Sequence, residues 1–135
     1  MNIIRGRAAQ HNPSKLAADN FTGTVWIDPI VPLTEEGHLV VSVTFSPGAR
    51  TYWHSHAEGQ FLLVTSGVGW VCAHGGTPQA IRAGDVVWTP PGEQHWHGAT
   101  PDTVMTHTAV SLGRPEWCQE VTPAEYAPGP DPESS

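Results

Sequence analysis

The amino-acid sequence predicts an all-β fold, either a barrel or a sandwich. The 135-residue chain contains 13 prolines and 14 glycines, which recur every few residues and leave little room for long helices. Between them lie short segments rich in Val, Thr, Trp and Phe: FTGTVWI, LVVSVTF, FLLVTS, GWVCA, DVVWT and VMTHTAV. Segments of this kind, separated by turn signals such as SPGA, HGGTP and TPPGE, are typical of antiparallel strands.

We expect a single domain, because the chain is long enough to bury one core without cross-links. An N-terminal segment (1–20) precedes the expected barrel (21–121). Residues 122–135 are expected to form a short helix and a disordered tail. Thr122 is a candidate N-cap with Pro123 at the first helical position, and the tail APGPDPESS has almost nothing apolar to bury.

Composition narrows the classes of partner. Thirteen acidic and six basic residues give a formal charge of −7, which argues against nucleic acid or an anionic membrane as the main partner. No apolar run approaches the roughly 18–20 residues of a membrane span. Cys72 and Cys118 lie far apart and lack the spacing of metal ligands. We therefore expect a soluble, cytoplasmic protein that acts on a small molecule.

The stretch YWHSHAEGQ contains a candidate metal site. Alternate residues of a strand share a face, so His54 and His56 should point to the same side. Gln60 could join them only if the chain turns between, and Gly59 supplies the conformational freedom for that turn. We expect Gln60 to open the antiparallel neighbouring strand, with Glu58 in the turn and directed to solvent.

Further histidines follow the strand GDVVWT. His95 comes directly after the turn PPGEQ and is a fourth candidate ligand, whereas His97 is expected in a loop, where its direction cannot be read. An isolated strand histidine is most often a hydrogen-bonded structural residue. Two histidine motifs at fixed offsets from glycines and prolines favour a metal site instead.

These offsets resemble the two motifs of the cupins. GARTYWHSHAEGQFLLVTSG (48–67) matches the first, with Gln60 in the glutamate position, and GDVVWTPPGEQHWHGA (84–99) matches the second, with Ala99 in the asparagine position. The resemblance implies an all-β fold consisting of a single cupin barrel, with a short C-terminal helix. It also implies that a metal ion is held inside the barrel by four ligands: His54, His56, Gln60 and His95.

Glutamine in place of glutamate changes the charge of such a site. Three neutral imidazoles and one amide leave a divalent ion its full charge, which favours anionic ligands. This donor set suits one divalent transition metal, among Mn, Fe, Co, Ni, Cu and Zn, and ligand softness alone does not select one of them.

Strand alternation predicts what else faces the ion. In TVMTHTAVS the residues Met105, His107 and Ala109 share a face, so His107 points inward if its apolar neighbours do. It is then either a general base, kept neutral by a nearby cation, or a core histidine bonded to a backbone carbonyl. An inward face of Val41, Val43 and Phe45 would make the pocket small and dry.

A closer resemblance, over roughly 21–111, is to small bacterial cupins that include manganese-dependent hydroxynitrile lyases. It implies manganese as the metal, His107 as the additional pocket histidine, and Val41, Val43 and Ser111 as pocket residues. The first functional hypothesis is therefore a lyase acting on a C–C bond next to a hydroxyl or carbonyl group, with the metal as Lewis acid and His107 as base.

Two other classes of function stay open. The same ligands with iron, copper or manganese could support an oxygen-dependent oxidative C–C cleavage. A non-catalytic module that binds a metal or a small ligand is the third hypothesis. Apolar residues such as Phe61 and Leu63 on an outer strand face predict a homodimer or homotetramer, with FTGTVWI a candidate for pairing between subunits.

Overall fold

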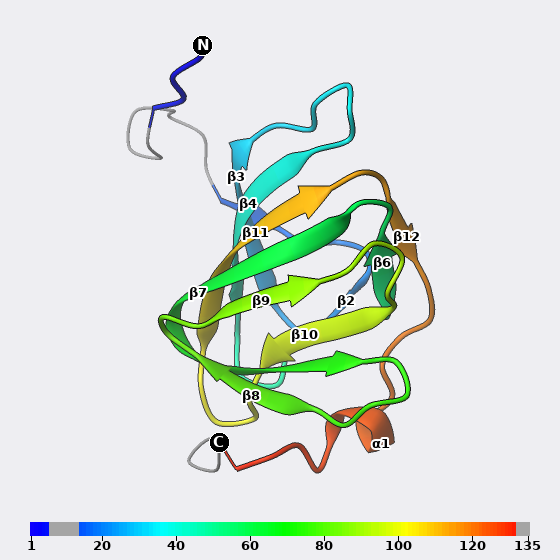
Figure 1. The fold of residues 1–135 in the computed structure, drawn as a ribbon. Helices are drawn as coiled ribbons and strands as arrows, with labels where there is room; N and C mark the ends of the chain where they lie inside the picture. The colour runs from blue at the N-terminus through cyan, green and yellow to red at the C-terminus, as the bar shows by residue number, and fades with distance from the viewer. Residues whose placement is uncertain (6–13, 132–135) are drawn as a thin grey trace.

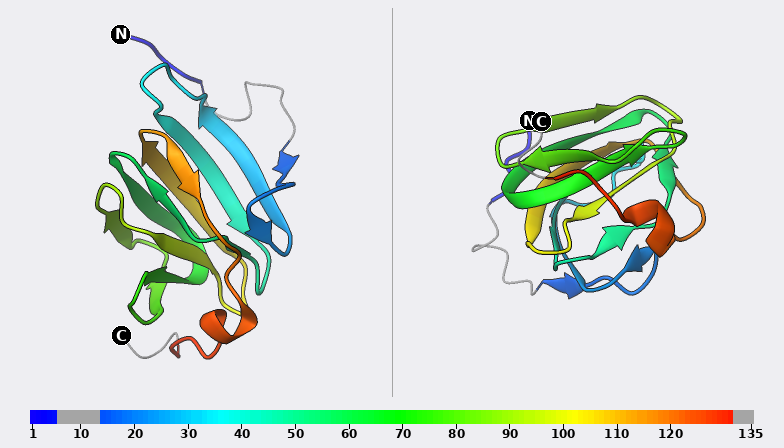
Figure 2. Two further views of the ribbon diagram at one scale, coloured as in Figure 1. Left: turned by 90° about the vertical axis from the view of Figure 1, so that its right-hand side faces the viewer. Right: turned by 90° about the horizontal axis from the view of Figure 1, so that it is seen from below.

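The computed structural model describes residues 1–5 and 14–131. All pairings between the described strands are antiparallel, and the strands form two facing halves of one curled sheet (Figures 1 and 2). The first half contains, in spatial order, β1 (Lys15–Leu16), β3 (Val25–Val31), β4 (Leu39–Phe45), β11 (Met105–Leu112), the start of β7 (Gly59–Ala73) and β9 (Val86–Thr89). The second half contains β2 (Phe21–Thr22), β5 (Arg50–Thr51), β10 (His95–Ala99), the end of β7, β8 (Gln79–Arg82), β6 (His54–His56) and β12 (Pro115–Trp117).

The long strand β7 joins the two halves. Its first residues pair with β11 and β9, and its last residues pair with β10 and β8. The register with β11 shifts between Thr106 and His107, which leaves an extra residue on β7 and bends it. Gly67 follows this shift with φ 76°, and a Cβ there would collide with the Val104 carbonyl oxygen. The bend therefore depends on glycine at this position.

The connection from β6 to β7 differs from the sequence-based expectation. We expected Gln60 to open the antiparallel neighbour of the histidine strand, but β6 pairs with β10 and β12 instead. The turn at Ala57–Glu58 carries the chain from one half of the sheet to the other. Gly59 has φ 98°, and a Cβ there would collide with Trp88 and Thr89, so the crossing is too tight for a side chain.

The ends of the chain also show differences. Lys15 and Leu16, inside the segment set apart as N-terminal, pair with Ile27 and Trp26 of β3. Trp26 and Ile27 also pair with β4, so this part of FTGTVWI already has partners on both edges within the chain.

The predicted C-terminal helix is present as α1 (Pro123–Tyr126). Thr122 is its N-cap and forms a capping box with Glu125. The tail after it was expected to be disordered, yet Gly129 lies against the Trp70 ring, whose Nε1 donates to the Pro130 carbonyl oxygen at 3.1 Å. The rest of that tail, 132–135, lies outside the described residues. Among the described residues no helix is long and apolar enough to cross a membrane.

Two apolar clusters fill the molecule. The barrel cluster lies between the sheet halves and consists mainly of aliphatic residues: Val25, Val41, Val43, Phe45, Ala49, Leu62, Val64, Ile81, Ala99, Met105 and Ala109. The helix-end cluster is packed against α1 and is largely aromatic: Trp53, Trp70, Cys72, Trp96, Val121 and Tyr126. The alternation of buried and half-exposed residues along β4 and β11 confirms the expected inward faces of both strands.

Candidate metal and active site

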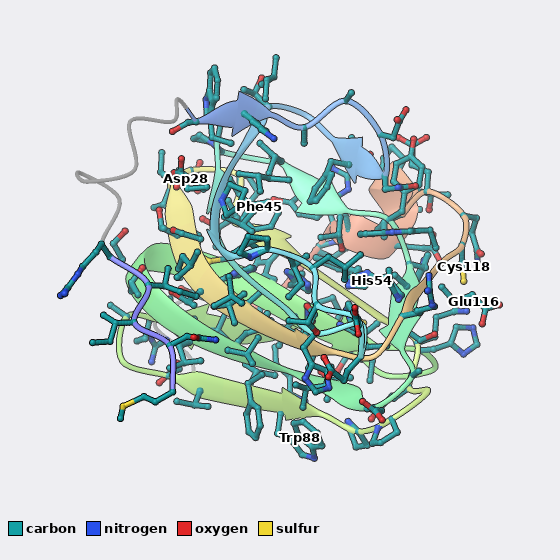
Figure 3. All side chains as sticks on the ribbon, turned by 90° about the horizontal axis from the view of Figure 1, so that it is seen from above. Asp28, Phe45, His54, Trp88, Glu116 and Cys118 are labelled. Atoms are coloured by element: carbon teal, nitrogen blue, oxygen red, sulfur yellow. The ribbon has the colours of Figure 1, made fainter. Side chains whose placement is uncertain are left out.

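Two neighbouring strands carry four histidines into the barrel. His54 and His56 on β6 are buried on either side of the half-exposed Ser55, as the strand period requires. His95 lies directly opposite His54 on β10, with ring centroids 4.3 Å apart, and His97 follows on the same strand. Figure 3 shows His54 inside the barrel and Trp88 directed away from it.

Backbone carbonyls fix the tautomers of two of these rings. His54 Nδ1 lies 2.9 Å from the Tyr52 carbonyl oxygen, and His95 Nδ1 lies 3.0 Å from that of Glu93. A carbonyl oxygen only accepts hydrogen bonds, so both Nδ1 atoms carry the proton and donate it. The Nε2 atoms are left with free lone pairs, in the arrangement that orients metal-binding histidines in general.

Gln60 places its amide between β10 and β11. Its Nε2 donates to Ser111 Oγ at 3.0 Å, and its Oε1 lies 2.9 Å from His95 Nε2. Since His95 Nε2 has no proton in the tautomer set by Glu93, two acceptors face each other across this short distance. A cation at that point would turn an unfavourable contact into coordination.

His56 also fits a metal-binding role. Its side chain is 5 % exposed, and neither ring nitrogen has a hydrogen-bond partner among the described residues. Its ring centroid lies 5.1 Å from that of His54 and 5.8 Å from that of His95. Buried imidazoles are nearly always hydrogen-bonded or coordinated, so the missing partner is consistent with a bound ion.

His97 is the residue that the sequence did not place. We expected it in a loop, but it is the third residue of β10, 3 % exposed, and has the same parity as His95. One ring nitrogen from each of His54, His95 and His97 lies within 4.8 Å of the others. This cluster and the four expected ligands have His54 and His95 in common. The sequence did contain a signal for His97, because a residue two positions after His95 in a strand points to the same face.

His107 points into the barrel, as expected from β11. It is fully buried, with its ring centroid 5.2 Å from that of Phe45. Its Nε2 lies 2.9 Å from His97 Nδ1, so the two rings share one hydrogen bond. The remaining nitrogens, His97 Nε2 and His107 Nδ1, are buried without a partner among the described residues. This histidine pair can accept a proton at one ring and pass it to the other.

Burial lowers the pKa of every histidine in the site, and it is the largest cause in each case: His54, His56, His95, His97 and His107. The pKa falls to about 4 for His56 and His107. All five rings are thus neutral at pH 7 and present lone pairs rather than charges.

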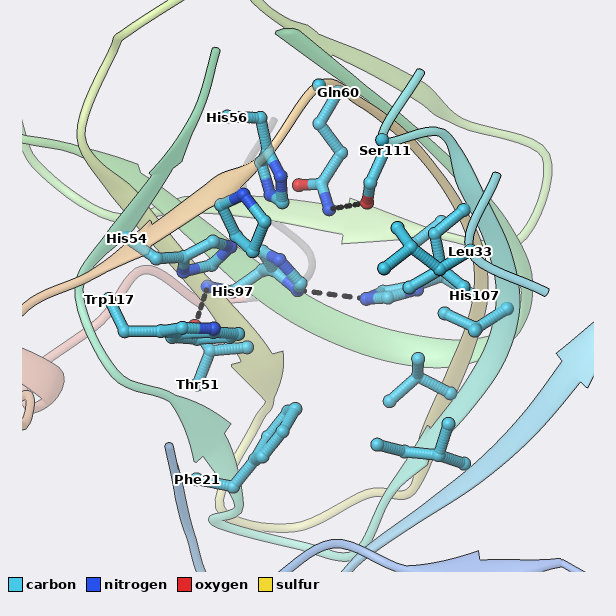
Figure 4. Close-up of a pocket in the computed structure, with 18 residues that line it drawn as sticks. Phe21, Leu33, Thr51, His54, His56, Gln60, His97, His107, Ser111 and Trp117 are labelled. Atoms are coloured by element: carbon cyan, nitrogen blue, oxygen red, sulfur yellow. Dashed lines mark hydrogen bonds between the residues drawn. The ribbon is translucent and has the colours of Figure 1, made fainter. Parts of the chain in front are cut away.

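A cavity of about 270 Å³ is lined by four of these histidines, His54, His56, His97 and His107 (Figure 4). It is smaller than the roughly 300–1,000 Å³ of pockets that hold drug-sized ligands. Most of its lining is apolar, and the expected pocket residues Val41, Val43 and Ser111 all contribute to it. Glu58 is not part of the lining; its exposed carboxylate lies 3.2 Å from His38 Nε2, as expected for a turn residue that faces solvent. The site thus combines a neutral donor set with a small, dry space.

Comparison with known proteins agrees with this architecture. Residues 41–110, which span β4 to β11, match the model of the cupin domain. The chain belongs to the cupin family. This cupin is 47 % identical over 125 residues to an (R)-mandelonitrile lyase from Granulicella tundricola, a match that covers 89 % of this chain and 95 % of the relative.

Solved structures show the same fold. A cupin-like protein from Thermotoga maritima superposes with a TM-score of 0.80 at 39 % identity, covering 87 % of this cupin and 93 % of that chain. A polyketide cyclase from Streptomyces resistomycificus has a TM-score of 0.69 at 15 % identity, covering 93 % and 89 % of the two chains. The second similarity concerns the fold alone.

Proposed function

We propose that this cupin is a hydroxynitrile lyase that cleaves an aromatic cyanohydrin into an aldehyde and hydrogen cyanide. The observation that carries the proposal is a cluster of neutral histidines at a mostly apolar cavity, in which His97 also shares a hydrogen bond with His107. The 47 % identity to an (R)-mandelonitrile lyase over most of both chains supports the same reaction.

The proposed metal ligands are His54, His56, Gln60 and His95. The free Nε2 lone pairs, the unpartnered His56 ring and the Gln60 oxygen facing His95 all suit a divalent cation. We propose manganese, which the resemblance to manganese-dependent lyases favours; iron, zinc, nickel, cobalt and copper accept the same donors. When bound, such an ion supplies positive charge that stabilises an anion in the cavity.

In the proposed reaction the protein moves one proton. The hydroxyl proton of the cyanohydrin passes to the His97–His107 pair while the C–C bond to the nitrile breaks. The electron pair of that bond leaves with the cyanide carbon, and the oxygen forms the aldehyde C=O. The cyanide then takes the proton back from the histidine pair and leaves as HCN. Proton transfer of this kind contributes typically 10²–10⁴-fold in rate.

The surroundings of the histidine pair suit this exchange. Phe45 packs against both rings, with centroid distances of 5.9 Å to His97 and 5.2 Å to His107. The aliphatic residues Val41 and Val43 line the cavity beside them. Because burial keeps both rings neutral, the pair holds a proton only briefly and returns it readily to cyanide.

Mandelonitrile cleavage tests the proposal. Formation of benzaldehyde would be followed with metal-depleted protein and with protein reloaded with Mn²⁺, in air and under argon. We expect activity only after reloading with Mn²⁺. The rates in air and under argon should be equal, because the reaction involves no oxidation or reduction and consumes no oxygen. Activity confined to air would favour the oxygen-dependent cleavage instead. If no cyanohydrin is turned over, the non-catalytic binding function would be favoured.

We also propose that the protein assembles as a homodimer or homotetramer. Phe61, Leu63 and Trp88 are 39–45 % exposed on the outer face of β7 and β9, and the Phe61 and Trp88 rings lie 4.5 Å apart. Such an apolar face favours association. Light scattering in solution would measure the molar mass, and a monomer at micromolar concentration would contradict this.

A further inference from the structure

One wall of the cavity is aromatic and adjoins a proposed metal ligand. Trp117 lies opposite His54 in the β12–β6 pairing, and the two rings stack with centroids 4.5 Å apart and planes at 29°. Phe21 completes the wall, with its ring centroid 5.9 Å from that of Trp117 and 6.3 Å from that of Phe45. In Figure 4, Trp117 and Phe21 lie on the His54 side of the cavity, with Leu33 across from them.

Both residues of this wall lie outside the segment that matches the cupin domain. Phe21 and Trp117 belong to β2 and β12, which flank the residues 41–110 that match the cupin domain. Of the described residues that line the cavity, only these two carry a phenyl or indole ring; the other apolar ones are aliphatic: Ile27, Leu33, Leu39, Val41, Val43, Ala109 and Pro115. The aromatic surface of the cavity therefore comes from these two short strands, and the rest of its apolar lining is aliphatic.

We propose that Trp117 and Phe21 form a recognition wall for the aryl ring of the substrate, and that Trp117 is the main determinant of the preference for aromatic over alicyclic groups. This proposal rests on the proposed function, which identifies the reacting group as a cyanohydrin. It adds the residues that select the group attached to the cyanohydrin carbon.

The position of the wall supports this role. The cavity is lined by His97 and His107, by Trp117, which is stacked on His54, and by Phe21. Phe21 reaches the histidine pair through Phe45, whose ring contacts both histidines. An aryl substituent of a substrate bound in this cavity would meet Trp117 and Phe21, in the offset or tilted arrangements that aromatic pairs prefer.

Trp117 is also free enough to contact a ligand. It is 36 % exposed and belongs to a three-residue edge strand whose residues are all exposed, so it lies at the rim of the cavity rather than in the core. Its ring is held on one face by His54. The remaining indole surface is available to a ring that enters the cavity.

The test compares two acids that differ only in ring character. Binding of benzoate and of cyclohexanecarboxylate to Mn²⁺-loaded protein would be measured by calorimetry for the unchanged protein and for Trp117→Leu, Trp117→Phe and Trp26→Leu. Both acids share the carboxylate, so any effect of Trp117 on the His54 region cancels in the ratio of their affinities. Trp26, 44 % exposed on β3 and absent from the cavity lining, is the matched control.

We expect the unchanged protein to favour benzoate roughly three- to tenfold, the range of an added aromatic contact. Trp117→Leu should bring the ratio close to unity, Trp117→Phe should keep most of it, and Trp26→Leu should not change it. If Trp117→Leu does not fold, Phe21→Leu would be used instead, and it should lower the affinity ratio by a smaller factor. Equal or undetectable binding of the two acids by the unchanged protein, or an unaltered ratio in Trp117→Leu, would overturn the proposal.

The binding ratio is independent of turnover. If mandelonitrile is not cleaved but the preference for benzoate depends on Trp117, the lyase proposal fails and the recognition wall stands. If mandelonitrile is cleaved and the ratio ignores Trp117, the wall fails and the lyase stands.

Discussion

The two apolar clusters of the barrel differ in the kind of buried polar group that lies unpaired beside them. In the helix-end cluster, Tyr126 Oη donates to the Ala99 carbonyl oxygen at 2.7 Å, and the guanidinium of Arg50 donates to the Val121 carbonyl while lying 4.3 Å above the Tyr126 ring. Beside the barrel cluster, by contrast, the rings of His56, His97 and His107 retain buried nitrogens without a partner among the described residues.

This difference separates stability from function. The helix-end cluster also keeps unpartnered nitrogens, the Nε1 atoms of Trp53 and Trp96 and the Nε atom of Arg50, but these are N–H donors without a lone pair for a cation, whereas a neutral imidazole has one. Unsatisfied imidazoles lower stability unless something binds them, so they are retained where a ligand completes the site. Substitutions in the helix-end cluster should therefore unfold the protein, and substitutions beside the barrel cluster should leave it folded but inactive.

His107→Ala should have the largest effect on activity. Removing one member of the histidine pair takes away the proton acceptor, and kcat for mandelonitrile cleavage should fall by about 10²–10⁴-fold. Metal content and the thermal unfolding temperature should change little, since His107 is not among the proposed ligands. His38→Ala is the matched control, because His38 is half-exposed and bonds Glu58 outside the cavity. Equal activities of the two variants would show that His107 has no catalytic role.

Trp96→Ala should have the largest effect on stability. Trp96 is fully buried in the helix-end cluster, and truncating a buried tryptophan typically costs about 3–5 kcal/mol of the free energy of unfolding. Urea denaturation would measure the loss, and metal bound per folded molecule should be unchanged. Trp88→Ala on the outer face should cost far less. A similar loss in both variants would remove the distinction between the two regions.

Gln60→Glu should sharpen the argument about charge. The added carboxylate would repel an anion about 4 Å away by about 4 kcal/mol at an effective dielectric constant of about 20. A loss of only about 1.4 kcal/mol in binding free energy already weakens affinity about tenfold. We therefore expect cyanide and azide to bind at least about tenfold more weakly, with the metal retained. Spectral titration of the metal-loaded protein would measure this. Unchanged anion affinity would contradict the importance of a neutral donor set.

Thr122→Ala should have the smallest effect and only on stability. Thr122 Oγ1 accepts from the Glu125 backbone N–H at 3.1 Å, and the Glu125 carboxylate accepts from the Thr122 N–H at 2.9 Å. Losing this capping box should cost about 1 kcal/mol, whereas Thr122→Ser should cost almost nothing. Thermal unfolding would rank the variants, and a loss of metal in Thr122→Ala would show that the two ends of the barrel are coupled.

Strand alternation accounts for what could be predicted from the sequence. The inward faces of Val41, Val43, His107 and Gln60 all follow from a period of two in segments long enough to show it. The cupin barrel was predicted by the resemblance of the two motifs to those of the cupins, since the strand pattern alone left a barrel and a sandwich open. The assignment of His54, His56, Gln60 and His95 as metal ligands stays a prediction that experiment must test.

The parts that could not be predicted involve strands too short to show a period or connections between sheets. His97 was assigned to a loop because the turn signals around PPGEQ extended, in our reading, beyond the start of β10. Trp117 belongs to a three-residue strand in LGRPEWC, where no alternation is visible. The crossing from β6 to β7 depends on long-range pairing with β10 and β11, which local sequence does not encode.

Elemental analysis is the most direct test of the central claim. The protein would be purified from cells grown without added metals, together with His54→Ala and His95→Ala. We predict a stoichiometric divalent transition metal in the unchanged protein and a loss of most of it in both variants, which should stay folded because their helix-end cluster is intact. No metal in the unchanged protein, or undiminished metal in both variants, would contradict the proposed site.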